Sequence, residues 1–201
     1  GGDHPPPARG GARAGRCTTD CRRGVLPAMH GASHGRCQNC RMHSEHAKSI
    51  VERSVGDMLN LIRETLELEV VFVGEFVNDQ RVFRHVSQSE GMTLIEVGGG
   101  HPLDASLCWH IANGRFPPVV CNVREVVDAY ELPPMYEQLG GHVGVPVRLA
   151  DGRLYGSLCG FSTKACPHLQ AQDVKRMEIA AQAIARLLAQ AEGRDVIALD
   201  D

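Results

Sequence analysis

Apolar residues recur at three- and four-residue steps between residues 50 and 66, which is the pattern of an amphipathic helix. Ser44 stands before this segment and is a candidate N-cap. A second stripe of the same kind, rich in alanine, runs through residues 169–191. We expect two long helices at the ends of a domain, each packed along a sheet or against a partner's matching helix.

Between these helices, apolar and β-branched runs predict strands. Segments 69–77 and 81–87 flank a polar turn, which indicates a hairpin. Segments 141–149 and 153–161 flank Asp151-Gly152, a dipeptide typical of tight hairpin turns. Two hairpins therefore supply most of the predicted sheet.

Shorter elements occupy the middle of the chain. We expect a short helix over 104–114, with Asp104 as its N-cap and Gly114 as its C-cap, and a short buried strand over 118–123. The order of elements predicts an α+β fold with a central antiparallel sheet. The N- and C-terminal helices lie on one face, and the short helices and loops cover a ligand pocket on the other.

Composition divides the chain into unlike parts. The 201 residues are 43% hydrophobic, enough for one domain and too apolar for a wholly disordered chain. Residues 1–42 carry seven arginines against two aspartates, whereas the remainder is acidic. We therefore expect a basic, flexible leader over 1–42, one folded domain over 43–192 and a C-terminal tail over 193–201.

The same composition argues against several partners. No apolar run approaches the roughly 18 residues of a membrane span, so no membrane contact is expected. The leader's arginines lack interleaved aromatic residues, so nucleic-acid binding is not expected. The leader also lacks the apolar core of a secretory signal, which favours a cytoplasmic location.

Four of the eight cysteines lie in or beside this leader. Cys17-x3-Cys21 and Cys37-x2-Cys40 are two close pairs separated by fifteen residues, a spacing compatible with tetrahedral zinc. The x3 spacing of the first pair and the absence of apolar residues between the pairs favour incidental thiols in a flexible segment. Both interpretations stay open.

The second part resembles the GAF domain, the sensory module of many bacterial signalling proteins. The resemblance rests on the segments Leu107-Cys108-Trp109-His110, Asn113-Gly114-Arg115, Val119–Val123, His142–Leu149 and Gly152–Phe161, followed by a helix from Gln172. It implies a ligand-gated module that acts beside an output domain, and no such output domain is present in these 201 residues.

Specialised GAF-like families differ from this chain at their defining positions. Bilin-binding relatives carry a Cys-His pair before a tyrosine such as Tyr136, but Leu132-Pro133 stands there, and heme-binding relatives carry an axial histidine where Leu132 stands. Neither heme nor bilin is therefore expected. The free methionine sulfoxide reductases resemble the chain at Cys108 but need a second cysteine, which the loop between Asn122 and His142 lacks. No motif singles out a cyclic-nucleotide site, which stays open.

Strand alternation divides the predicted strand 153–161 into two faces. Arg153, Tyr155, Ser157, Cys159 and Phe161 share the more polar face, which we assign to the pocket. Cys108 stands near a helix N-terminus, a position that lowers a thiol's pKa, although burial as a small apolar side chain is the simpler interpretation. The candidate ligand-binding residues are Cys108, Trp109, His110, Asn122, Tyr136, His142, Tyr155, Ser157 and Cys159.

These observations predict a non-enzymatic sensory domain. It binds a small cytosolic molecule of unknown identity and signals through its terminal helices, which also form a homodimer, to an output domain or partner. Two alternatives remain: a redox enzyme acting through Cys108, resembling free methionine sulfoxide reductase, and a dimerisation module without a ligand.

Overall fold

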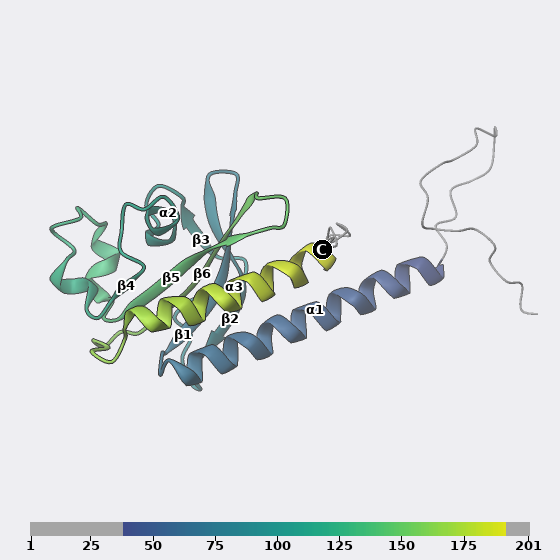
Figure 1. Ribbon diagram of the computed structural model, residues 1–201, viewed down its shortest axis with the longest axis horizontal. Helices are drawn as coiled ribbons and strands as arrows, with labels where there is room; N and C mark the ends of the chain where they lie inside the picture. Colours follow the sequence, from purple (N-terminus) through teal and green to yellow (C-terminus); the bar gives the residue numbers. More distant parts are fainter. Residues whose placement is uncertain (1–37, 192–201) are drawn as a thin grey trace, which may run out of the picture. The chain divides into compact units, whose positions relative to one another are not determined.

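The computed structural model describes residues 38–191 of the chain (Figure 1). The candidate zinc ligands Cys17, Cys21 and Cys37 and the tail at 193–201 lie outside the described residues, as does most of the leader. Cys40 lies in the first helix.

Six strands form one antiparallel sheet in the order β3-β2-β1-β6-β5-β4, which confirms the predicted fold class. The strands are β1 (Val70–Val77), β2 (Gln80–Gln88), β3 (Gly100–Pro102), β4 (Val119–Val120), β5 (His142–Arg148) and β6 (Leu154–Phe161). The two predicted hairpins, β1–β2 and β5–β6, meet where β1 pairs with β6. Asn78 and Asp79 make the first hairpin's turn with positive φ angles of 50° and 56°, because a tight turn of this kind needs left-handed residues.

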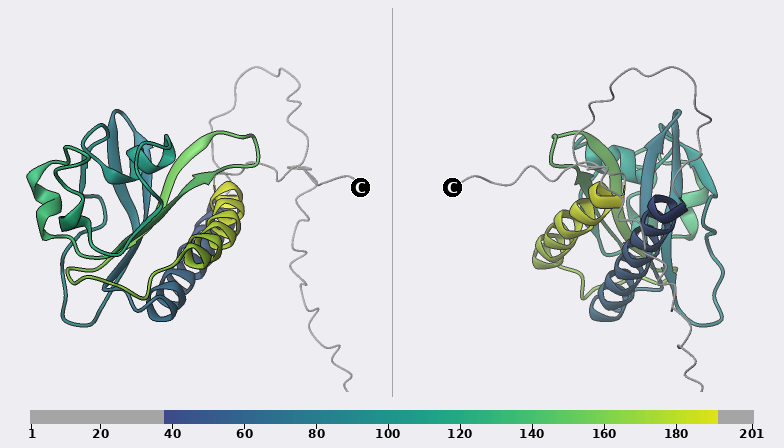
Figure 2. Two further views of the ribbon diagram at one scale, coloured as in Figure 1. Left: turned by 60° about the vertical axis from the view of Figure 1, so that its left-hand side comes forward. Right: turned by 90° about the vertical axis from the view of Figure 1, so that its right-hand side faces the viewer.

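The terminal helices α1 (Gln38–Thr65) and α3 (Ala171–Ala191) lie side by side on one face of the sheet (Figures 1 and 2). Fully buried side chains from both helices and from the inner strands form the main apolar core there, among them Val55, Leu59, Val145, Leu158, Met177 and Ile184. None of the helices described is long and apolar enough to cross a bilayer.

The first helix is longer than its apolar stripe predicted. It begins at Gln38, so Ser44 is inside the helix and is not its N-cap, and the boundary expected after residue 42 falls within the helix. The apolar stripe covers only the part of the helix that packs on the domain. The polar residues 38–49 that precede it contain no glycine or proline, so nothing in them interrupts the helix.

The opposite face of the sheet is covered by short elements, as expected. They are α2 (Leu107–Ala112) and the 3₁₀ turns η1 (Val123–Glu125) and η2 (Pro134–Gln138). The N-cap of α2 is Ser106 rather than Asp104: its side chain accepts a hydrogen bond from the Trp109 amide. The predicted strand over 118–123 shortens to β4, because η1 begins at Val123.

A bulge in the second hairpin changes which face one predicted residue occupies. Val147 pairs with Gly156 but Arg148 pairs with Leu154, so Tyr155 is an extra residue between them. Tyr155 consequently packs in the helix-side core and does not face the pocket as simple alternation predicted.

Close approach of α2 to the sheet requires a glycine on β5. A Cβ atom on Gly144 would lie 2.8 Å from Cys159 Sγ and 3.1 Å from both Ile111 Cδ1 and His142 Cε1. We predict that Gly144→Ala lowers the free energy of unfolding by about 1–3 kcal/mol, since the added methyl overpacks this contact. Urea denaturation measures the change.

Gly56 offers the matched control, because it lies in α1 and, apart from the adjacent residues and backbone of its own helix, no atom lies within 4 Å of the place that an added Cβ would take. Gly56→Ala should raise the free energy of unfolding by about 0.5–1 kcal/mol through helix propensity. Equal effects of the two substitutions would contradict the packing explanation.

Candidate functional site

A cavity of about 210 Å³ lies between the open face of the sheet and its covering elements. Its wall brings together side chains from β2, β3, α2, η2 and β5, chiefly Arg81, Phe83, His101, Cys108, Tyr136 and His142. A wider hollow of about 390 Å³ lies beside Phe116, Tyr130 and Glu178. That hollow contains none of the buried polar side chains, whereas the smaller cavity contains two, Arg81 and His142.

Arg81 places a positive charge in the cavity wall. Its side chain is only 5% exposed, and its guanidinium lies over the ring of Phe83, with 4.3 Å between Cζ and the ring centroid. Within the described part of the chain, no carboxylate forms an ion pair with it. Its Nε is buried without a hydrogen-bond partner. Because burying a cation costs several kcal/mol without compensation, this guanidinium requires anionic or acceptor groups around it.

Two neighbours meet part of that requirement. Arg81 Nη1 donates to Cys108 Sγ at 3.5 Å, and Nη2 donates to His101 Nδ1. Since a guanidinium can only donate, His101 accepts through Nδ1 and carries its proton on Nε2. Burial, together with the charge of Arg81, lowers the pKa of His101, which keeps this imidazole neutral.

Cys108 and Cys159 form a buried pair of thiols from α2 and β6. Cys159 donates to Cys108 Sγ with 3.1 Å between the two sulfur atoms, and both side chains are almost completely buried. Both are free cysteines. Of the two, only Cys108 lines the cavity.

The surroundings separate the acidities of the two thiols. The hydrogen bond from Cys159 outweighs the opposing effect of burial and, with the charge of Arg81 and the nearby His142, holds the pKa of Cys108 well below its usual range. Burial and the hydrogen bond to Cys108 raise the pKa of Cys159 well above its usual range. Burial opposes the charged form of Arg81, but the charge and hydrogen bond of Cys108, together with Tyr136 and Cys159, outweigh it, so the pKa of Arg81 is raised. Between a cation and a thiol donor, Cys108 is therefore the more acidic of the two thiols.

Tyr136 joins η2 to the start of α2. Its hydroxyl accepts from the Leu107 amide at 3.0 Å and donates to the Ala105 carbonyl at 3.1 Å. Burial raises the pKa of Tyr136 to about 12, so the phenol stays protonated and can donate. His142 enters from β5, and its Nδ1 is buried without a hydrogen-bond partner. These two candidate residues both line the cavity.

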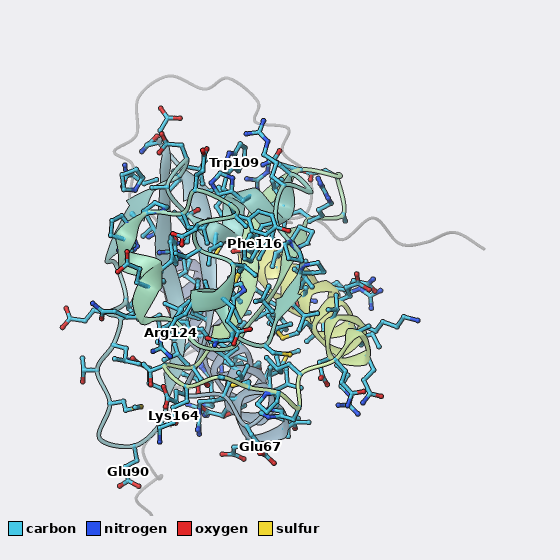
Figure 3. The ribbon with its side chains drawn as sticks, turned by 90° about the vertical axis from the view of Figure 1, so that its left-hand side faces the viewer. Glu67, Glu90, Trp109, Phe116, Arg124 and Lys164 are labelled. Atoms are coloured by element: carbon cyan, nitrogen blue, oxygen red, sulfur yellow. The ribbon has the colours of Figure 1, made fainter. Side chains whose placement is uncertain are left out.

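Arg124 holds the covering segments together from outside the cavity. Its guanidinium donates to the carbonyls of Glu137, Gln138 and Thr163 at 2.9, 3.0 and 2.7 Å. Gln138 and Thr163 both line the cavity. Figure 3 shows Arg124 on this face, nearer than Trp109 to the loop that carries Lys164.

Three other candidates lie away from the cavity. Trp109 packs edge-on against Phe76, with ring centroids 5.6 Å apart, on the outer side of α2. The His110 Nε2 atom is hydrogen bonded to the Asp104 carbonyl, and Asn122 donates to Glu125 Oε1. Adjacent positions on a helix point in different directions, so Cys108 alone of the segment 108–110 reaches the cavity. Ser157 is buried on the cavity side of β6, two residues before Cys159, with its Oγ unpartnered.

No protein-family model matches the chain, and no curated protein matches it by sequence. Solved structures do match it in three dimensions. One is the GAF domain of Acinetobacter phosphoenolpyruvate-protein phosphotransferase, with a TM-score of 0.58, 15% identity and coverage of 83% of this chain and 99% of that chain.

The chain has a GAF fold. A second similar structure is a type II free methionine-R-sulfoxide reductase from Thermoplasma acidophilum, with a TM-score of 0.55, 14% identity and coverage of 72% and 96% of the two chains. A third is a methyl-accepting chemotaxis protein, residues 122 to 287, with a TM-score of 0.57, 13% identity and coverage of 77% and 99%. The GAF resemblance found in the sequence is thus confirmed at the level of fold.

Two polar residues of this cavity were not among the candidates that the sequence indicated. Arg81 and His101 lie on β2 and β3, in segments whose polar character is typical of solvent-facing strands. Arg81 pairs with His101 across β2 and β3, but β3 has only three residues, which is too short for its hydrophobic pattern to predict a strand. Within residues 38–191, no cluster of three or more histidine, cysteine, aspartate or glutamate side chains is placed to hold a metal ion.

We predict that this domain carries a Cys108 thiolate at neutral pH. Ultraviolet thiolate absorbance should titrate well below the usual thiol pKa of about 8.5 and should be lost in Cys108→Ser. Because the folded-state pKa is depressed, the stability that the thiolate contributes is present above about pH 8.5 and is lost as the pH falls through the folded pKa. The free energy of unfolding, measured against pH, should therefore rise across that window in the wild type more than in Cys108→Ser.

Cys166→Ser supplies the control, because Cys166 is also buried but packs in the helix-side core. This variant should keep the low-pH thiolate. Wild-type absorbance that shows no thiolate below about pH 8 would contradict the assignment.

Proposed function

We propose that this GAF domain is a non-enzymatic sensory module that binds a small anionic molecule in the cavity. The observation that carries the proposal is the buried Arg81 guanidinium, which has no carboxylate partner in the described part of the chain and whose Nε has no hydrogen-bond acceptor. A carboxylate or phosphate oxygen is the group that such a donor prefers.

The rest of the cavity wall supports the same ligand class. His142 provides a second buried nitrogen without a partner, and Gln138 and Thr163 add polar groups to a wall that also contains the aromatic ring of Phe83. The volume of about 210 Å³ is below the roughly 300–1,000 Å³ of sites for drug-sized molecules. The ligand is therefore small, in the range of a short-chain carboxylate or inorganic oxyanion.

A route for the signal runs along β2 to the terminal helices. Arg81 lies near the start of this strand and Ser87 near its end. Ser87 Oγ accepts from Arg63 Nε at 3.0 Å and donates to Asn60 Oδ1 at 2.6 Å, and both partners belong to α1. A ligand that binds Arg81 and shifts its position would also shift β2, the strand whose Ser87 is hydrogen bonded to α1. Signalling to an output domain or partner requires that the ligand favour one arrangement of these elements over another.

The proposal includes a cytoplasmic location. Outside the leader and the first helix, the chain's four cysteines are all free thiols, which fits a reducing compartment.

The anion site is tested by Arg81→Gln. Thermal unfolding of the wild type is measured with formate, acetate, phosphate, sulfate and a series of three- to five-carbon mono- and dicarboxylates. At least one should raise the midpoint, since a ligand at 100 times its Kd adds about 2.7 kcal/mol to the free energy of unfolding. In Arg81→Gln the Kd of that probe should rise about 10- to 100-fold through the lost charged hydrogen bond.

Arg84→Gln is the matched control, because Arg84 belongs to the same strand but is exposed and pairs with Glu75. It should leave the Kd unchanged. A probe panel that leaves the wild-type midpoint unmoved, or an equal response in Arg81→Gln, would reject the anion site.

We also propose that a second copy of this chain covers an apolar groove between α1 and α3. The groove measures about 310 Å³, and the side chains of Leu61 and Ile179 at its edges are 65% and 70% exposed. The groove is lined by the C-terminal part of α1, and Figure 1 shows the N-terminal part of this helix extending past the end of α3. Two copies related by a twofold axis would bury both helix pairs as a four-helix bundle, which is the simplest closed assembly of such a surface.

The double variant Leu61→Glu and Ile179→Glu tests this interface. Size-exclusion chromatography with light scattering should show a dimer for the wild type and a monomer for the variant, because four buried carboxylates would repel one another without partners. Val97→Glu, at a position 66% exposed on a loop outside the groove, should remain dimeric. A wild-type monomer across the micromolar range would reject the dimer and leave the anion site unaffected.

A further inference from the structure

We propose that Cys108 and Cys159 are a redox modification site, in which a small hydroperoxide that enters the cavity oxidises Cys108 and Cys159 then closes a disulfide with it. The proposal rests on the paired geometry of the two sulfur atoms and stands independently of the anion site. It concerns one stoichiometric oxidation of the domain.

Position gives the two cysteines different roles. Cys108 lines the cavity, whereas Cys159 lies behind it and is completely buried. An oxidant in the cavity therefore meets Cys108 first. Cys159 already points its thiol at Cys108 Sγ across 3.1 Å, and a disulfide bond of about 2.05 Å needs the sulfur atoms to approach by only about 1 Å.

The contacts around Cys108 suit the first step. The Cys108 thiolate attacks one peroxide oxygen, the S–O bond forms and the O–O bond breaks, giving a sulfenic acid and hydroxide, which takes a proton from solvent. Arg81 Nη1 already contacts this sulfur and can donate to the leaving oxygen. The depressed pKa of Cys108 supplies the thiolate that the attack requires.

The second step uses the neighbouring thiol. The Cys159 sulfur attacks Cys108 Sγ, the S–S bond forms, and the sulfenic oxygen leaves as water with the proton of the Cys159 thiol. In total the thiolate, one proton from solvent, the thiol and one hydrogen peroxide give a disulfide and two waters. The electrons come from the two sulfur atoms, and the peroxide is the oxidant that is reduced.

A disulfide here would join α2 to the sheet. Cys108 belongs to α2 and Cys159 to β6, and α2 is otherwise held at this point by packing, by the Tyr136 hydroxyl and by the Arg81–Cys108 hydrogen bond. Oxidation also turns the anionic sulfur beside Arg81 into a neutral one. The modification therefore changes both the mobility of a covering element and the charge balance of the cavity.

The experiment treats the reduced 201-residue chain with hydrogen peroxide and then blocks remaining thiols with an alkylating agent under denaturing conditions. Peptide mass spectrometry should find a Cys108–Cys159 linkage in the wild type. The Cys108 thiol should be lost at least about tenfold faster than that of Cys166, a buried cysteine in the other core that serves as an internal control.

Variants separate the two steps. Cys159→Ser should stop at the sulfenic acid, which dimedone traps at Cys108, while Cys121→Ser should still form the linkage because Cys121 lies outside the cavity. The proposal would be overturned if peroxide left Cys108 and Cys159 unlinked in the wild type, with the Cys108 thiol lost no faster than the Cys166 thiol. A linkage of Cys108 to any other cysteine would also overturn it. Since the wild-type measurement needs no substitution, a variant that fails to fold leaves the test intact.

Discussion

The cavity face of this domain depends on the burial of one cation. The Arg81 guanidinium lies between the Phe83 ring, the Cys108 sulfur and His101, and so draws together β2, α2 and β3. Removing a charge from water is expensive, and here the cost is offset by a polarisable sulfur and an aromatic face where a carboxylate would be usual. One donor, Nε, is left buried without a hydrogen-bond partner, and the proposed anion site rests on it. The same charge adds to the hydrogen bond from Cys159, which is the larger cause of the lowered pKa of Cys108.

Two glycines provide the space for this arrangement. On β1, a Cβ at Gly74 would lie 3.1 Å from both Cγ and Cδ of Arg81, so the arginine crosses the sheet face where no side chain stands in its way. On β5, Gly144 lets α2 approach until Cys108 meets Cys159. The apolar core against α1 and α3 lies on the other face of the sheet, and its side chains are separate from these contacts. The apolar core on the helix side of the sheet can therefore stabilise the fold, while the cavity side contains buried polar groups such as Arg81 and His142.

Most of the layered architecture followed from local patterns. Helical periodicity marked α1 and α3, and turn residues marked both hairpins, because each of these signals is contained within a few adjacent residues. The site was harder to predict. Three of the predicted pocket residues line the cavity, namely Cys108, Tyr136 and His142, and Cys159 lies directly behind Cys108. Trp109 and His110, next to Cys108, point away from the cavity. A single bulge moves Tyr155 to the opposite face of the sheet.

By itself, the sequence determined the order of the long elements, the antiparallel sheet and the face that the terminal helices cover. Periodicity is a local property, because it depends only on residues within one element and not on the rest of the chain. Only the tertiary structure decided that Arg81 meets Cys108, 27 residues away, and that Cys159 meets Cys108 across 51 residues. Contacts at such separations follow from the bulges, glycines and short covering elements that bring distant segments together, and no pattern within one segment encodes them.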